Sequence, residues 1–370
     1  MKIAMALAGE GRGHTVRAVA LGQELIDLGH DLRFFTKGQS EDLLIERFGH
    51  DSLQIMPVPR FVSFGPRVSV TATGIMGGVF LLGIRNKVKQ TIDDMGDWRP
   101  DICISDFEPV LPRVAKKLKV PCISFDSQHF TIACDMKNYL SVIHRMRISI
   151  VALIAKIFNP YAKLHVVSKP FSLPVRKNKY HLVGPMLRPS IENGNWEPTN
   201  THIVCYSRAA LSKCLPEIFN YSEELGLEVR LYGFHPENIP THVKKMPISD
   251  QGFVDDLLSC NLIISTAGSQ LIGEVATLGI PSILIPEPGQ VEQDINARLA
   301  EFCYKNFVRI PYKEFSKDNV DRGVQCIEIQ SYPELKGGAR LATKIIIDYS
   351  ENMMSEKIGK NQIRVNHSLI

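Results

Sequence analysis

The sequence predicts an α/β protein built from two doubly wound, Rossmann-like parallel-sheet domains that face each other across a cleft. Short apolar runs alternate with longer amphipathic patterns along both halves of the chain, and this alternation is typical of βαβ units in a parallel sheet. The chain has 370 residues, and at about 150 residues per domain this length indicates two domains. Ligands of such sheets bind at the carboxyl ends of the strands, so the loops there carry the functional evidence.

The first half opens with an apolar run at 2–8, which predicts a buried strand that leads into a glycine-rich loop. An amphipathic pattern follows this loop and ends at Gly29, as expected for a helix with one buried face. Later apolar runs predict the remaining strands of this half at 31–35, 53–58, 101–105, 121–125 and 163–168.

A polar stretch rich in Gly, Pro and Asn then interrupts the alternation and is typical of a linker. We therefore expect an N-terminal domain at 1–185, a linker at 186–200, a C-terminal domain at 201–350 and a polar tail at 351–370. A helical pattern predicts a final helix over about 335–352. Apolar runs predict strands of the second domain at 202–206, 228–232, 262–265, 282–285 and 307–310.

Composition excludes several classes of protein. Lys and Arg number 43 and Asp and Glu number 39, so the net charge of +4 is too small to indicate nucleic-acid binding. The apolar stretches are shorter than the ~20 residues of a membrane-spanning helix. Glu10 and Arg12 follow the first stretch, unlike the pattern of a signal peptide. The eight cysteines show no metal-ligand spacing and are typical of free thiols in a reducing cytoplasm.

The loop after the first strand, residues 9–14, reads GEGRGH and opens a helix. It differs from the dinucleotide-binding fingerprint, because His14 stands where a third glycine is required. The loop therefore argues against a nicotinamide enzyme. A histidine behind three glycines at the mouth of a cleft can act as a general base. The alternative is a histidine that caps the helix or lies in the core.

Polar residues also follow two later strands of this half. Asp106 comes after the strand at 101–105, where it can orient His14 and stabilise its protonated form. The alternative is that Asp106 caps the next helix. Asp126 and His129 follow the strand at 121–125, and we expect both to contact substrate.

The fourth loop lies in the second half. Small residues at 265–269 leave backbone N–H groups at a helix N-terminus available for a diphosphate. Glu274, further along this helix, can accept both ribose hydroxyls, and Glu292 with Gln293 can hold sugar hydroxyls. The alternatives are that Gly268 is part of a plain turn and that Glu292 is a solvated charge at a helix N-terminus.

The segment from Gly252 through Ala297 resembles the C-terminal domain of the two-lobed (GT-B) glycosyltransferases. The resemblance is to family 28, the family of the bacterial enzyme that adds N-acetylglucosamine to the lipid-linked muramyl peptide precursor. The glycine loop with His14 is similar to the N-terminal loop of the same superfamily. By this resemblance the N-terminal domain binds the acceptor and the C-terminal domain binds a nucleotide sugar.

The resemblance also implies roles for individual residues. His14 would be the catalytic base and Asp106 its partner, Phe253 and Val254 would lie beside the uracil, and Arg208 would contact the diphosphate. The full expected donor set is Arg208, Phe253, Val254, Thr266, Gly268, Ser269, Gln270, Glu274, Glu292 and Gln293, and the expected acceptor set is Gly11, Arg12, Gly13, Asp126 and His129.

The expected reaction is an inverting, metal-independent transfer of a hexose or N-acetylhexosamine from a UDP-sugar to an acceptor hydroxyl. We expect no cofactor and no metal. A lipid-linked or cell-envelope acceptor is one expectation that the resemblance supports. A UDP-sugar 2-epimerase and a non-catalytic nucleotide-sugar-binding subunit are the alternatives.

Two segments, 74–89 and 136–163, combine apolar residues with Arg and Lys. One interpretation is a basic, amphipathic surface that contacts the inner face of the plasma membrane from the cytoplasm. The other is a pair of buried helices of the acceptor domain with solvated ends.

Overall fold

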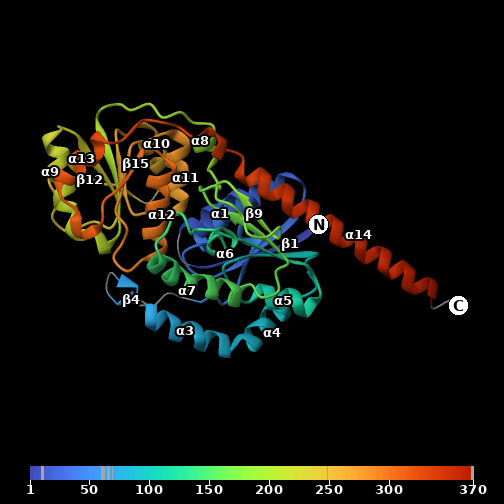
Figure 1. The fold of residues 1–370 in the computed structure, drawn as a ribbon. Coiled ribbons are helices and arrows are strands. Elements are labelled where there is room, and N and C mark those ends of the chain that lie inside the picture. The colour runs from blue at the N-terminus through green and yellow to red at the C-terminus, as the bar shows by residue number, and fades with distance from the viewer. Residues whose placement is uncertain (10–11, 60–62, 65–66, 69, 248, 368–370) are drawn as a thin grey trace.

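The computed structural model describes residues 1–9, 12–59, 63–64, 67–68, 70–247 and 249–367. Two separate parallel sheets form its framework (Figure 1). The first has the order β3-β2-β1-β6-β7-β8-β9 and the second the order β12-β11-β10-β13-β14-β15. In both sheets all neighbouring strands are parallel, as predicted. A short antiparallel pair, β4 (Ser63–Phe64) and β5 (Arg67–Val68), lies outside both sheets.

Every predicted strand is present, within a few residues of its expected bounds. The strands of the first sheet are β1 Lys2–Leu7, β2 Asp31–Thr36, β3 Leu53–Ile55, β6 Ile102–Asp106, β7 Cys122–Asp126, β8 Leu164–Ser168 and β9 Tyr180–Val183. Those of the second are β10 His202–Ser207, β11 Glu228–Gly233, β12 Val243–Lys245, β13 Ile263–Ser265, β14 Ser282–Leu284 and β15 Phe307–Arg309.

The sequence does not predict the short pair β4 and β5, and within the two parallel sheets it misses β9 and β12, which both lie at a sheet edge. The central strands are continuous apolar runs because helices cover both faces of the sheet; all five positions of β6, β7 and β8 are buried. An edge strand lacks this constraint, and β12 has two exposed lysines.

The helices that border the cleft begin at the carboxyl ends of strands. The order of each sheet reverses beside its first strand, between β1 and β6 and between β10 and β13, and these switch points are where ligands bind in such folds. The helices that matter below are α1 Arg12–Asp27, α3 Val70–Leu82, α5 Leu111–Leu118, α7 Val142–Phe158, α9 Leu215–Glu224, α10 Asp250–Ser259, α11 Ser269–Leu278, α12 Val291–Cys303 and α13 Lys317–Gln325.

The last helix corrects two expectations. α14 runs from Gly338 to His367, so residues predicted to form a polar tail are helical up to His367. Its first turns also leave the second sheet: Ala342 and Ile346 are fully buried in the core of the first sheet, although the predicted boundary assigns them to the second domain. The polar composition of the end obscured a segment rich in good helix formers. In Figure 1 this helix extends from the first sheet to the C-terminus.

The chain therefore crosses between the sheets twice, and the crossings are tied together. The short helix α8 (Pro189–Glu192) lies on the first crossing, inside the predicted linker. Glu192 accepts hydrogen bonds from the backbone N–H of Gly337 (2.8 Å) and from Arg340 (2.9 Å) on the second crossing. These hydrogen bonds join the two segments of chain that run between the sheets.

Candidate active site

The first half of the site joins the N-terminus of α1 to the end of β6. His14 Nδ1 lies 2.9 Å from Oδ1 of Asp106, the last residue of β6. Arg17 follows one helical turn later and donates from Nε to Asp106 Oδ2 (3.0 Å) and from Nη2 to Oδ1 (2.7 Å). Asp106 and Arg17 are buried. The fold thus brings the predicted pair together, within a cluster in which Arg17 supplies the opposite charge that a buried carboxylate needs.

Arg17 also affects the histidine directly, because its Nη2 lies 2.9 Å from His14 Nδ1. A guanidinium can only donate hydrogen bonds. Arg17 therefore favours a lone pair on Nδ1, whereas Asp106 favours a proton there. The tautomer of His14 therefore depends on which of these two contacts prevails.

Phe107 closes the other side of this cluster. Its backbone has a φ of +53°, a left-handed conformation that costs a bulky residue about 1–3 kcal/mol. Its ring stacks on the His14 ring with centroids 6.3 Å apart and packs on Phe158 at 5.1 Å. The loop after β6 therefore holds the imidazole between a charged and an aromatic neighbour.

The capping role considered for Asp106 belongs to Glu108. Its carboxylate accepts hydrogen bonds from the backbone N–H of Val110 (2.6 Å) and Leu111 (3.1 Å) at the start of α5. Burial raises the pKa of Glu108 to about 7, although these hydrogen bonds and Ser105 oppose the effect. Asp106 is thereby left to His14 and Arg17.

Lys169, directly after β8, connects the two sheets. Its side chain is only 3% exposed, and Nζ donates to Glu292 Oε1 (3.1 Å) and Asn296 Oδ1 (3.0 Å), both on α12. Glu292 itself is 37% exposed. Burial alone would raise the pKa of Glu292, but Lys169, and more weakly His14 and Arg17, hold it below its usual value. The carboxylate predicted to bind the donor sugar therefore lies within the electrostatic reach of the predicted base.

The second half of the site is the loop between β13 and α11. Thr266 is buried, whereas Gly268, Ser269 and Gln270 are partly exposed. Gly268 is the N-cap of α11, and a Cβ added there would meet nothing within 4 Å. Space thus lies in front of a helix N-terminus whose N–H groups favour an anion.

The two predicted loops face each other. A Cβ added to Gly13, in the first turn of α1, would lie 4.0 Å from Cβ of Gln270, in the first turn of α11. Two helix N-termini from different sheets therefore converge on one place. This arrangement suits a ligand that carries negative charge near the reacting atoms.

Glu274 and Gln270 have partners in this structure. Glu274 is fully buried and forms an ion pair with Arg188 on the first crossing, with Arg188 Nε 3.0 Å from Oε1. Gln270 Nε2 donates to Glu274 Oε1 (3.1 Å) and to the backbone C=O of Met186 (2.6 Å). Ribose hydroxyls would share or replace the contact with Arg188, so the predicted role of Glu274 stays a prediction.

Gln293 and Arg208 meet at Glu287. The backbone N–H of Glu287 donates to Gln293 Oε1 (2.9 Å), and Gln293 Nε2 donates to Glu287 Oε1 (2.7 Å). Arg208 Nε lies 3.3 Å from the same oxygen, and its side chain is 52% exposed. Arg208 is therefore half exposed and paired with Glu287, and the Gln293 amide also binds protein atoms.

Phe253 and Val254 lie in α10. Phe253 is buried edge-on against Tyr232, with ring centroids 4.9 Å apart, and Arg188 lies over its ring at 5.4 Å. Val254 is completely buried in the second turn of the helix, where the backbone N–H bonds within the helix. This placement gives no support to the expectation that backbone groups of Val254 bind the base, which stays a prediction.

The predicted acceptor contacts are less accessible. Asp126 and His129 are buried and bind each other, with His129 Nδ1 2.7 Å from Asp126 Oδ2. Burial opposes ionisation of Asp126, but His129 and Ser124 lower its pKa well below the usual range. The His129 ring packs on His165, with centroids 4.5 Å apart. Gly11 and the side chain of Arg12 lie outside the described residues, so their roles stay predictions.

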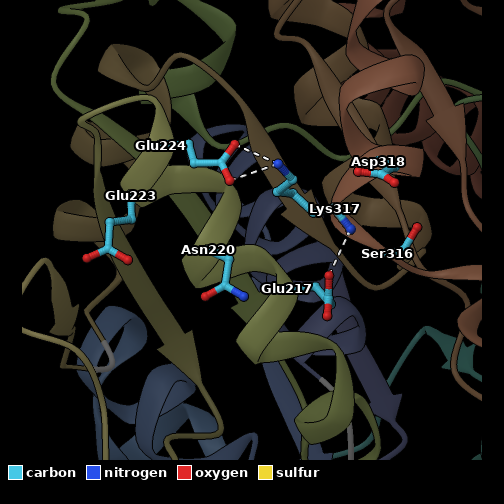
Figure 2. A pocket seen from close by; sticks show the side chains of 7 residues that line it. All are labelled: Glu217, Asn220, Glu223, Glu224, Ser316, Lys317 and Asp318. Atoms are coloured by element: carbon cyan, nitrogen blue, oxygen red, sulfur yellow. Dashed lines mark hydrogen bonds and ion pairs between the residues drawn. The ribbon is translucent and has the colours of Figure 1, made fainter.

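A distinct hollow of about 410 Å³ lies between α9 and α13, on the second domain (Figure 2). Glu217, Glu224 and Asp318 line it, and Lys317 binds Glu224 across it at 2.6 Å. None of the predicted site residues lines this hollow, so it is unrelated to the cleft described above.

Sequence reasoning missed Arg17, Lys169 and Arg188. Arg17 is three residues after His14 on the same helix, a spacing that places two side chains on one face. Lys169 follows a predicted strand directly, and this is the same position that singled out Asp106. Arg188 lies in the linker and has no comparable signal.

In the described part of the chain, no group of three His, Cys, Asp or Glu side chains is placed to hold a metal ion. In the same residues, no helix is long and apolar enough to span a membrane.

Comparisons with known proteins identify the family of the chain. Residues 1–322 match the family model described as Glycosyl transferase family 1. An uncharacterised glycosyltransferase from Methanosarcina acetivorans is 24% identical over 336 residues, 81% of this chain and 83% of that protein. The UDP-N-acetylglucosamine–N-acetylmuramyl-(pentapeptide) pyrophosphoryl-undecaprenol N-acetylglucosamine transferase of Listeria monocytogenes is 25% identical over 93% of this chain and 94% of its own.

Solved structures confirm the fold. The glycotransferase of kitacinnamycin superposes with a TM-score of 0.62 at 18% identity and covers 98% of both chains. Together with the two parallel sheets, this match confirms the expected two-domain GT-B architecture.

Proposed function

The chain belongs to glycosyl transferase family 1, and on that premise we propose that it transfers a hexose or N-acetylhexosamine from a UDP-sugar to an acceptor hydroxyl with inversion and without a metal ion. One observation carries the proposal. The cluster of His14, Arg17 and Asp106 on the first sheet faces the N-terminus of α11 on the second, and Glu292 lies within electrostatic reach of the cluster.

The acceptor oxygen attacks the anomeric carbon from the face opposite the diphosphate. The bond between that carbon and the diphosphate oxygen breaks, its electron pair leaves with UDP, and the hydroxyl proton passes to His14 Nε2. This step requires the tautomer in which Nδ1–H is donated to Asp106. The N–H groups before and at Ser269 then stabilise the leaving diphosphate.

The donor is tested by thermal stabilisation. UDP, GDP, ADP, dTDP and a panel of UDP-sugars are compared; a ligand at about 100 times its Kd raises the free energy of unfolding by ~2.7 kcal/mol. We expect UDP to stabilise the protein selectively. Selective stabilisation by another nucleotide would overturn the choice of UDP.

Product analysis then tests the reaction. Free UDP together with a glycoside is expected. An epimerised nucleotide sugar would indicate the 2-epimerase, and binding without turnover for any acceptor class would indicate the non-catalytic subunit.

We further propose a lipid-linked acceptor at an anionic membrane. The exposed face of α7 carries large apolar side chains at helical spacing, and Arg147 and Lys156 flank it. The last turns of α3 expose three more large apolar side chains. In Figure 1 both helices, α3 and α7, lie on the lower side of the view. The exposed apolar residues are Met76, Val79 and Leu82 on α3 and Val142, Ile143, Met146, Ile150, Leu153 and Ile157 on α7.

Vesicle co-sedimentation tests this surface. We expect binding to vesicles that contain phosphatidylglycerol and weaker binding to pure phosphatidylcholine. Met146→Glu with Ile150→Glu should abolish binding, whereas Leu225→Glu, an exposed apolar position on the other domain, should leave it unchanged. Equal binding by both variants would contradict the membrane proposal.

A further inference from the structure

Lys169 connects the two halves of the site through buried contacts. It follows β8, so the first sheet fixes its backbone, and its Nζ reaches Glu292 and Asn296 on α12. A buried ammonium is costly unless it is paired and hydrogen-bonded. The buried ammonium of Lys169 is therefore stable in this position only when α12 lies against the first sheet.

Asn296 extends the connection to the loop before α11. It is buried, and its Nδ2 donates to the backbone C=O of Ala267 at 3.0 Å. Ala267 directly precedes Gly268, the N-cap of α11. One ammonium of the first sheet thus holds both the carboxylate at the start of α12 and the loop in front of α11.

We infer that Lys169 is a positioning residue that aligns Glu292 with the donor sugar and keeps its carboxylate available when the two sheets come together. This inference rests on the proposed UDP-sugar function. It assigns Lys169 no contact with the reacting atoms. Its effect should therefore appear in the affinity for the sugar part of the donor and not in the affinity for UDP.

The charges around Glu292 determine the pH at which its carboxylate becomes protonated. Lys169, His14 and Arg17 face it from the first sheet. On its own helix, Asp294 is paired with His144, Arg298 and Arg309. Loss of the Lys169 charge leaves Glu292 partly buried with less compensation, so it protonates at higher pH.

The experiment is calorimetric titration of Lys169→Met and the wild type with UDP and with the best UDP-sugar of the panel, from pH 4.5 to 8. No acceptor is needed, so the proton transfer to His14 does not enter the result. In the wild type, the ratio of the two affinities should stay constant across this range. In Lys169→Met, the ratio should fall by about 10- to 100-fold, the range expected when a hydrogen bond between a charged group and the ligand is lost.

The fall should be steepest at acid pH, where the loss of affinity for the UDP-sugar begins about 1–3 pH units higher than in the wild type. Lys169→Arg restores the charge and should restore part of the ratio. Lys177→Met makes the same chemical change at an exposed lysine before β9 and should change nothing. Retained UDP binding shows that Lys169→Met is folded.

A double mutant tests the coupling. If Lys169 acts through Glu292, then Lys169→Met should have no further effect on the ratio in a Glu292→Gln background. Additive losses, an unchanged ratio, or an equal loss of UDP affinity would each overturn the inference. A wild type that binds neither UDP nor any UDP-sugar would instead overturn the proposed donor.

Discussion

The two faces of the cleft are built in different ways. On the first domain, Asp106 at the end of β6 is paired with His14 and Arg17 of α1, and Lys169 after β8 reaches Glu292 of α12, which is partly exposed. On the second domain, the central feature is the N-terminus of α11, where backbone N–H groups face open space at Gly268. Side chains set the chemistry on one face, and backbone geometry sets it on the other.

This difference explains why the sequence is informative to different degrees in the two halves. Most of the expected second face lies in one continuous segment, 252–297, because a strand, a loop and a helix follow one another directly; Arg208 lies outside this segment. On the first face, His14 and Asp106 are 92 positions apart in the chain, and Lys169 meets Glu292 of the second face over a separation of 123 positions. Substitutions should therefore have different consequences on the two faces, and four experiments test this.

The largest expected effect is that of His14→Ala on turnover. Loss of a general base typically costs about 10²–10⁴-fold in rate, whereas UDP, which we propose to bind on the opposite face, should bind with unchanged affinity. Initial rates of UDP release and calorimetric UDP binding measure the two properties. Turnover near the wild-type rate would show that His14 is not the base.

Arg17→Met should mainly reduce stability. It leaves the buried carboxylate of Asp106 without its guanidinium, and removal of one partner of a buried ion pair costs about 3–5 kcal/mol. Urea denaturation measures this cost. Arg340→Met, at a 67% exposed ion pair with Glu192, is the matched control and should cost at most about 1 kcal/mol. Similar losses in both variants would contradict the buried cluster as the main support of this face.

Gly268→Val, on the second face, should mainly weaken UDP binding and have little effect on stability, unlike Arg17→Met. The new side chain meets no protein atom within 4 Å of its Cβ, so the free energy of unfolding should change by less than about 0.5 kcal/mol. It would occupy the space expected for a phosphate, and UDP binding should weaken by about 1–3 kcal/mol. Unchanged UDP affinity would place the diphosphate elsewhere.

The smallest expected effects concern pH and stability on the first domain. Burial lowers the pKa of His165 to about 3, below its usual 6.5; the stability that this neutral histidine contributes is present above pH 6.5 and is lost as the pH falls. Burial raises the pKa of Glu108 from 4.5 to about 7; its contribution is greatest below pH 4.5 and is lost as the pH rises through 7. Between pH 4.5 and 6.5 the two effects oppose each other.

Single variants should separate them. With His165→Phe, the free energy of unfolding should rise on acidification from pH 6.5 to 4.5, and with Glu108→Gln it should fall, each by at most ~1.4 kcal/mol per pH unit. Urea denaturation across this range measures both slopes. Parallel slopes in the two variants would contradict the assignment of either group.

The sequence by itself determined the class of the fold, most strand positions and the loop that precedes α11. Apolar runs report burial on both faces of a parallel sheet, and a loop that opens a helix can be recognised within a few consecutive residues. It also placed His14 and Asp106 at strand ends, from which their proximity could be expected.

Only the tertiary structure decided which charges neutralise one another. Arg17 binds Asp106, Lys169 binds Glu292, and Arg188 binds Glu274 because strand order and the two crossings bring distant segments together. The same holds for α14, which returns to the first sheet. Local sequence encodes burial and periodicity, but the pairing of buried charges depends on contacts between elements, and no local pattern records those contacts.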